Sequence, residues 1–209
     1  MRKNMNTRVT GTNVILVPYE KKHVTKYHEW MKCPTLRYLT GSEPLTLEEE
    51  FEMQKHWLED ADKCTFIILD KHIFHSTGSE SIADAMIGDT NLFFNDPEES
   101  HTAEVEIMIA DMASRGKRRG WESVILMIRY GIETLGINEF RAKIKLDNAL
   151  SIKMFEKLDF QEIGRSQLFQ EMTLEKRVSS DWIDQLSREL QSIASDSNEL
   201  VTGVVTSNH

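Results

Sequence analysis

The stretch that most constrains the fold of this chain is a β-patterned run that leads through a short basic turn into a long helix. Residues 103–110 alternate as a strand does, and the turn reads Arg-Gly-Lys-Arg-Arg-Gly at 115–120. Apolar residues then recur at helical spacing over 121–135, and Gly136 follows where a C-terminal cap would stand. The first turn of a helix has backbone N–H groups without intrahelical partners, at the positive end of the helix dipole. We therefore predict an anion site, suited to a phosphate, at residues 115–120, which we call the elbow.

The strand before the elbow has two unlike faces. One face carries Val105, Ile107 and Ile109. The other face carries Glu104, Glu106, Met108 and Ala110. Two carboxylates are thus expected on the face that approaches the elbow.

The residues before this strand predict strands and helices in mixed order. We expect strands over 13–19, 64–69 and 85–95, the first near a sheet edge and the last with a bulge at Gly88 and a closing turn at 95–97. Helical spacing over 23–31 predicts one helix, and a capping box of Thr46 and Glu49 begins a second. The polar residues 70–84 predict an extended hairpin loop.

The residues after the elbow helix predict the closing part of a sheet. We expect a strand over 140–146, a short helix over 149–158, and strands over 160–163 and 168–174 joined by a turn near Gly164. The sum is an α/β (α+β) fold whose mixed sheet has helices on both faces. Residues 1–177 form one domain in this interpretation, and 178–209 form a C-terminal helix, at about 179–195, and a disordered tail.

Charge and cysteine content limit the possible partners. The net charge of −9 over 209 residues argues against non-specific nucleic-acid binding, because that needs a basic surface. Cys33 and Cys64 are too few for a zinc site or a disulfide framework, and His72 with His75 has no further ligand at metal spacing. No stretch approaches the roughly 18 apolar residues of a membrane span. We expect a cytoplasmic or nuclear protein without metal, membrane or nucleic-acid partners.

Two motifs are similar to signatures of the GCN5-related N-acetyltransferase (GNAT) superfamily. The elbow matches its pyrophosphate-binding pattern, Gln/Arg-x-x-Gly-x-Gly/Ala, at Arg115 and Gly120. The run from Asn148 and Ser151 to residues 155–160, Phe-Glu-Lys-Leu-Asp-Phe, is similar to its Asn-x-x-Ser…Tyr-Glu-Lys-x-Gly-Phe signature. Stretches at 27–31, 42–48, 59–67 and 106–110 resemble a small eukaryotic branch, N-acetyltransferase 9.

The resemblance implies a mostly antiparallel sheet of about seven strands, with a splay between its two central strands, and acetyl-CoA as the cofactor. The pantetheine would lie in the splay and the pyrophosphate on the elbow amides. The resemblance assigns cofactor contacts to Ile107, Met108, Ile109, Ala110, Arg115, Gly116, Lys117, Arg118, Arg119, Gly120, Trp121, Asn148, Ser151 and Phe155.

For acetyl transfer to an amine, Glu106 and Glu104 are the candidate general bases, because they share the strand face that leads to the expected thioester. A solvated or ion-paired glutamate is the alternative for each. Asp89 and His101 are weaker candidates. A backbone N–H near Met108 or Ile109 is the expected oxyanion donor.

Three residues depart from the family pattern. Arg118 stands where the pattern has glycine, so either a positive φ strains the elbow there or the guanidinium itself pairs with phosphate. Phe155 replaces a tyrosine that in many relatives protonates the leaving thiolate, and it has no proton to give. Asp159 replaces a glycine, which we attribute to turn geometry.

The acceptor amine is left open by the sequence. The resemblance implies a primary amine of a protein, at its N-terminus or on a lysine, while a small polyamine fits the acidic chain equally. Members of the similar branch are connected with microtubules, so tubulin is one candidate partner. The alternative function is an acetyltransferase fold that acts by binding a partner with weak or absent catalysis, and oligomeric state is not predicted.

Overall fold

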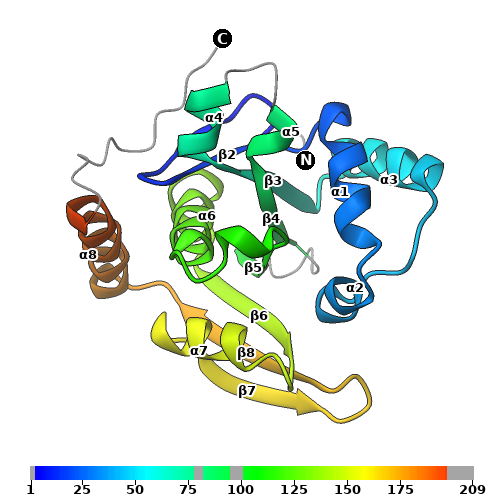
Figure 1. Ribbon diagram of the computed structural model, residues 1–209. Coiled ribbons are helices and arrows are strands. Elements are labelled where there is room, and N and C mark those ends of the chain that lie inside the picture. The colour runs from blue at the N-terminus through cyan, green and yellow to red at the C-terminus, as the bar shows by residue number, and fades with distance from the viewer. Residues whose placement is uncertain (1–2, 78–81, 95–100, 197–209) are drawn as a thin grey trace.

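A computed structural model describes residues 3–77, 82–94 and 101–196. The helices are η1 (Lys21–His23), α1 (Val24–Met31), α2 (Pro34–Thr40), α3 (Leu47–Glu59), α4 (Lys71–Thr77), α5 (Ile82–Ala85), η3 (Met112–Ser114), α6 (Arg119–Leu135), α7 (Ala149–Lys157) and α8 (Ser180–Asp196). The strands are β1 (Val9–Thr10), β2 (Val14–Pro18), β3 (Lys63–Asp70), β4 (Met86–Phe93), β5 (Thr102–Ile109), β6 (Glu139–Lys145), β7 (Gln161–Ser166) and β8 (Glu171–Arg177). The strands form one sheet in the order β1-β2-β3-β4-β5-β6-β8-β7 (Figure 1).

The described sheet has eight strands, and β5 with β6 is its parallel pair. The predicted mixed and mostly antiparallel architecture is confirmed, with the two-residue strand β1 added to the expected number. Within the described residues, no helix is both long and apolar enough to cross a bilayer.

The two central strands separate soon after they meet. β5 pairs with β6 at Thr102↔Glu139, Ala103↔Phe140 and Glu104↔Arg141. Beyond this point β5 continues its pairing with β4 as far as Ile109, and β6 continues with β8 as far as Lys145. Figure 1 shows β6, β8 and β7 leaving the rest of the sheet in this way. The predicted splay is therefore present, and it opens on the elbow side of Glu104.

Alternation along the strands builds a core on each face of the sheet. Phe66, Ile68 and Val105 belong to the cluster on the side of α6 and α8. Ile67 and Met108 belong to the cluster on the side of α1 and α3. The helices on both faces thus follow from period-two patterning, as predicted.

Gly88 holds β4 close to β5 where the splay opens. A Cβ at this position would lie 1.9 Å from the carbonyl oxygen of Met108. The register with β3 shifts beside it, from Ile68↔Gly88 to Leu69↔Met86, so the expected bulge is present. The Ile87 carbonyl accepts hydrogen bonds from the N–H groups of Ala110 and Asp111, which fixes the end of β5.

One sequence-based expectation about the early elements is wrong. Residues 70–84 contain α4 and α5 rather than only a hairpin loop. Asp70 Oδ1 accepts hydrogen bonds from the N–H groups of His72 and Ile73, so its side chain caps α4. The helix expected over 23–31 is present as α1 and ends at Met31. Pro34 then opens a further helix, α2, at a position where proline's missing N–H costs nothing.

The turn predicted near Gly164 is also wrong. Gly164 lies inside β7 at a register shift, and the chain reverses between β7 and β8, where Gln170 has a φ of 52°. The predicted turn at 95–97 and most of the predicted tail lie outside the described residues.

The C-terminal helix is confirmed and joins the main core. α8 packs against α6, and its Leu186 and Leu190 belong to the same cluster as that helix. The indole N–H of Trp182 donates a 2.9 Å hydrogen bond to the carbonyl of Leu158.

Candidate active site

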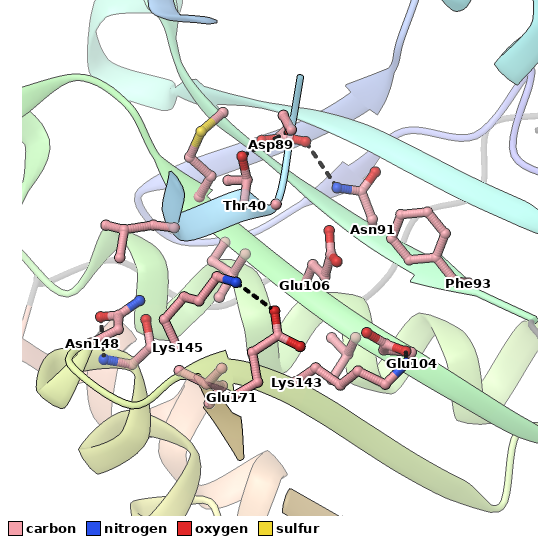
Figure 2. A pocket seen from close by; sticks show the side chains of 18 of the residues that line it. Thr40, Asp89, Asn91, Phe93, Glu104, Glu106, Lys143, Lys145, Asn148 and Glu171 are labelled. Atoms are coloured by element: carbon pink, nitrogen blue, oxygen red, sulfur yellow. Dashed lines mark hydrogen bonds and ion pairs between the residues drawn. The ribbon is translucent and has the colours of Figure 1, made fainter. Parts of the chain in front are cut away.

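The splay contains a cavity of about 420 Å³. One wall comes from β4 and β5, the opposite wall from β6 and the start of α7, and the end of α2 lies across it (Figure 2). The predicted site residues that line this cavity are Glu104, Glu106, Ile107, Met108, Asn148, Ser151 and Phe155. The structure thus brings residues of β5 together with residues of the second motif, which η3, α6 and β6 separate from β5 in the sequence.

The remaining predicted site residues lie outside this cavity. Ile109 is the last residue of β5, Ala110 follows it, and the elbow residues lie further along the chain toward α6. His101 is exposed and contacts the Gly136 carbonyl through Nδ1 at 3.1 Å, so it is not brought to the cavity. Asp89, the other weaker candidate, does line it.

Glu106 and Asp89 form the polar floor of the cavity. Glu106 is opposite Asn91 in the register of β5 with β4, and Asn91 Nδ2 donates to Asp89 Oδ2 at 2.9 Å. The Thr65 hydroxyl donates to Asn91 Oδ1 at 2.6 Å, which orients that amide. Asp89 Oδ1 is buried without a hydrogen-bond partner among the described residues. A buried carboxylate oxygen without a partner is costly, so this atom is available to a donor from a ligand.

Burial raises the pKa of both carboxyl groups and so favours their neutral forms. Burial, and then the charges of Glu104 and Asp89, raise the pKa of Glu106 to about 7. Burial raises the pKa of Asp89 to about 6. A general base works best when its pKa lies near the working pH, so Glu106 has the protonation behaviour that proton removal from an amine requires.

Lys63, at the start of β3, is a cavity residue that the sequence did not reveal. Its ammonium lies 2.8 Å from the ring centroid of Trp57 and 4.3 Å from that of Phe93. Burial lowers its pKa to about 7, against the opposing charges of Glu106 and Asp89. The signal in the sequence was a lysine one residue before an apolar run, which by itself is typical of an exposed strand end.

Glu104 is held in an ion pair across the splay. Its Oε2 accepts a 2.7 Å hydrogen bond from Lys143 Nζ on β6 (Figure 2). The side chain of Lys143 is half exposed, so the pair lies toward the mouth of the cavity. Glu104 is therefore an ion-paired glutamate, which was the alternative to a general base. Glu106 instead faces the interior of the cavity.

The elbow has the backbone shape expected of an anion site. Gly116 has a φ of 72°, Arg118 has a φ of 59°, and α6 begins at Arg119 without a side-chain cap. Because no side chain takes the first N–H groups of this 17-residue helix, they remain for a ligand. Gly120 lies against β5, where a Cβ would be 3.2 Å from Ile109 Cγ1.

The basic side chains of the elbow contact the protein itself. Arg115 Nε donates to the Ile109 carbonyl at 2.8 Å, and Arg119 Nε pairs with Asp70 at 3.0 Å. Arg118 pairs with Asp196 at 2.8 Å and lies 3.6 Å from Glu189, both on α8. Lys117 is exposed.

Arg118 and Trp121 both contact the C-terminal helix α8. Arg118 adopts the positive φ that favours glycine, and its guanidinium points to the carboxylates of α8. Trp121 also contacts α8, through a 3.1 Å hydrogen bond from its indole to Glu189. The C-terminal helix therefore supports the elbow from outside.

Replacing Arg118 by Gly should leave the protein as stable or more stable and should leave acetyl-CoA binding equal or tighter. The left-handed conformation costs a non-glycine residue about 1 kcal/mol, whereas exposed ion pairs contribute at most about 1 kcal/mol. Arg118→Ala is the matched control, because it loses the ion pairs and keeps the strain. Urea unfolding and calorimetric titration measure both effects, and a strong loss of binding in both variants would identify the arginine as a phosphate ligand.

The second motif begins α7. Asn148 is the N-cap of this helix, and its Oδ1 accepts a 3.2 Å hydrogen bond from the Ser151 N–H. Phe155 is 2 % exposed and packs edge-on against Phe160 at 5.0 Å. Asp159 has a φ of 66°, so the departure from glycine there concerns turn geometry, as expected.

Comparison with known proteins decides the family. A family model described as an acetyltransferase (GNAT) domain matches residues 13–161. The chain belongs to the GNAT acetyltransferase family. The expected resemblance is confirmed, and the protein is an N-acetyltransferase by family.

The relatives of this GNAT protein include the predicted branch. It is 49 % identical over 174 residues to an N-acetyltransferase 9-like protein of Nematostella vectensis, covering 83 % of this chain and 87 % of the relative. It is 49 % identical over 180 residues to a protein of Homo sapiens named alpha/beta-tubulin-N-acetyltransferase 9, covering 86 % and 87 %. A spermidine N-acetyltransferase of Vibrio cholerae, solved with CoA and spermine, shares the fold at a TM-score of 0.67 and 15 % identity over 80 % of this chain and 96 % of that one.

Proposed function

We propose that this GNAT protein transfers the acetyl group of acetyl-CoA to a primary amine of a protein, by direct attack of the amine on the thioester. The observation that carries the proposal is the cavity in the splay, where Glu106, partly buried and with a pKa raised to about 7, faces the gap between β5 and β6. The name of the human relative makes tubulin the proposed acceptor.

The residues present fit acetyl-CoA. Beyond Glu104 the edge of β5 that faces β6 has no strand partner among the described residues, so its peptide groups can pair with the amides of a pantetheine chain. The elbow offers the unpaired N–H groups of α6 and two residues of positive φ for a diphosphate. Acetyl-CoA, when bound, supplies an activated thioester.

The chain's own groups then have separate tasks. Glu106 accepts the proton of the amine. The unpaired Oδ1 of Asp89 accepts a hydrogen bond from the amine and so orients the amine for attack. A backbone N–H near Met108 or Ile109 would donate a hydrogen bond to the thioester oxygen of acetyl-CoA. Phe155 has no proton to donate, so the leaving thiolate would take its proton from solvent.

Incubation with purified tubulin and acetyl-CoA tests this proposal. Mass spectrometry should find one added acetyl group on an N-terminal or lysine amine, and the group should be absent with the Glu106→Gln variant. Binding of acetyl-CoA without transfer to tubulin or to any amine-bearing peptide would overturn the proposed activity and favour a protein that acts by binding a partner.

A further inference from the structure

A second cavity, of about 630 Å³, adjoins the first on the acceptor side. It lies between α1, the segment before α3 and α3 itself, and it shares Tyr27, Ser42 and Trp57 with the cavity in the splay. The two cavities are therefore neighbours across a common wall of three residues. A molecule whose amine reaches Glu106 can extend past this wall into the second cavity.

The walls of the second cavity combine apolar and acidic groups. Met31, Leu45 and Met53 supply apolar surface, and the acidic lining includes Glu43, Glu50 and Glu52. No lysine or arginine is among the described residues that line it. Long cationic side chains have this same combination of an apolar stem and a charged end.

Glu50 is the buried member of this acidic set. It is 2 % exposed, and its carboxylate contacts His28 Nδ1 at a long 3.4 Å. Burial raises its pKa, which the histidine partly opposes. A buried carboxylate is stabilised most effectively by a cation that also donates hydrogen bonds. Apart from histidine, the described residues that line this cavity include no cationic side chain, so a ligand can supply one.

Tyr27 lies at the junction of the two cavities. It is 5 % exposed and lines both of them. Burial raises the pKa of this phenol, and the carboxylates of Asp89, Glu50 and Glu106 act in the same direction. A protonated phenol that lines both cavities can donate a hydrogen bond to a backbone carbonyl of the acceptor.

We propose that the second cavity is a subsite for a cationic side chain of the acceptor peptide, close in sequence to the amine that is acetylated. The stem of an arginine or lysine packs between Met31, Leu45 and Met53, and its charged end meets Glu50. Tyr27 contacts the peptide backbone between the two positions. This inference rests on the proposed function, because it assumes that the amine occupies the cavity in the splay.

Peptides that differ at one residue test the subsite. Three peptides share a free N-terminus and carry arginine, its neutral isostere citrulline, or glutamate next to the first residue. Calorimetric titration in the presence of acetyl-CoA measures binding, and mass spectrometry measures acetyl transfer. We expect the arginine peptide to bind about tenfold or more tightly than the citrulline peptide and the glutamate peptide to bind weakest, with the preference falling as salt increases.

Two variants locate the effect. Glu50→Gln should remove the preference for arginine over citrulline, while Glu59→Gln, on the same helix but outside both cavities, should keep it. Thermal unfolding confirms that both variants are folded. Equal binding of the three peptides, or a preference that survives Glu50→Gln, would overturn the subsite.

The two readouts separate the subsite from the reaction. Preference for the arginine peptide without any acetyl transfer supports the subsite and contradicts the proposed function. Transfer to all three peptides at equal rates supports the function and contradicts the subsite. Spermidine forms a further arm, and binding of this polyamine with no binding of any peptide would overturn the assignment of the cavity to a peptide side chain.

Discussion

Replacing Glu106 by Gln should lower kcat about a hundredfold or more, because a positioned general base contributes at least this factor. The wild-type rate should rise with pH through about 7, the pKa to which burial raises Glu106, and then level off. The variant should lack this rise. Steady-state rates measured from about pH 5.5 to about pH 8.5, the range over which a carboxyl group with this pKa titrates, show both effects. An unchanged pH profile would exclude Glu106 as the base.

The stability of the same variant distinguishes lost chemistry from lost folding. The pKa of Glu106 is raised on folding, so its contribution to stability is present below its unfolded pKa, near 4.5, and is lost as pH rises through about 7. At pH 8 the ionised carboxylate therefore costs the folded state a few kcal/mol at most. Glu106→Gln should be more stable than wild type there and equal to it at pH 4. Glu104→Gln, which alters the ion pair with the half-exposed Lys143, should change kcat little.

Replacing Gly120 by Asp should weaken acetyl-CoA binding about a hundredfold or more. Gly120 is in the first turn of α6, where the N–H groups and the helix dipole favour an anion. An aspartate there places a negative charge beside the diphosphate and competes for the same N–H groups. Calorimetric titration of acetyl-CoA measures the loss.

Gly120→Ala is the matched control for volume. Its Cβ would meet Ile109 Cγ1 at 3.2 Å, a side-chain contact that a small movement relieves. The alanine variant should therefore keep most of the affinity. Equal binding by the aspartate variant and the wild type would show that the diphosphate does not rest on the elbow.

The elements around the elbow were predictable because one-dimensional patterns determine them. Period-two alternation identified β5, and the apolar stripe with Gly136 identified α6 and its end. The helix α4 was missed because the side chain of Asp70 caps it from the end of a strand, in a polar segment with a weak apolar pattern. Gly164 was misplaced because a glycine at a bulge looks like a glycine at a turn.

The candidate site was predictable only in part. Glu106 could be proposed from the face that it shares along β5, but the neighbours that shift its pKa depend on strand register, which is not readable from one strand. Lys63 reaches the cavity because β3 pairs with β4 and places Lys63 opposite Phe93. The partners of Arg118 come from α8, about 70 residues away in the sequence.

Thermal unfolding with and without acetyl-CoA tests the central claim, that the splay and the elbow bind this molecule. A ligand present at a hundredfold its dissociation constant stabilises the folded state by about 2.7 kcal/mol, so the wild-type transition should move clearly upward, and that of Gly120→Asp should not. An unchanged wild-type transition at millimolar acetyl-CoA would contradict the account.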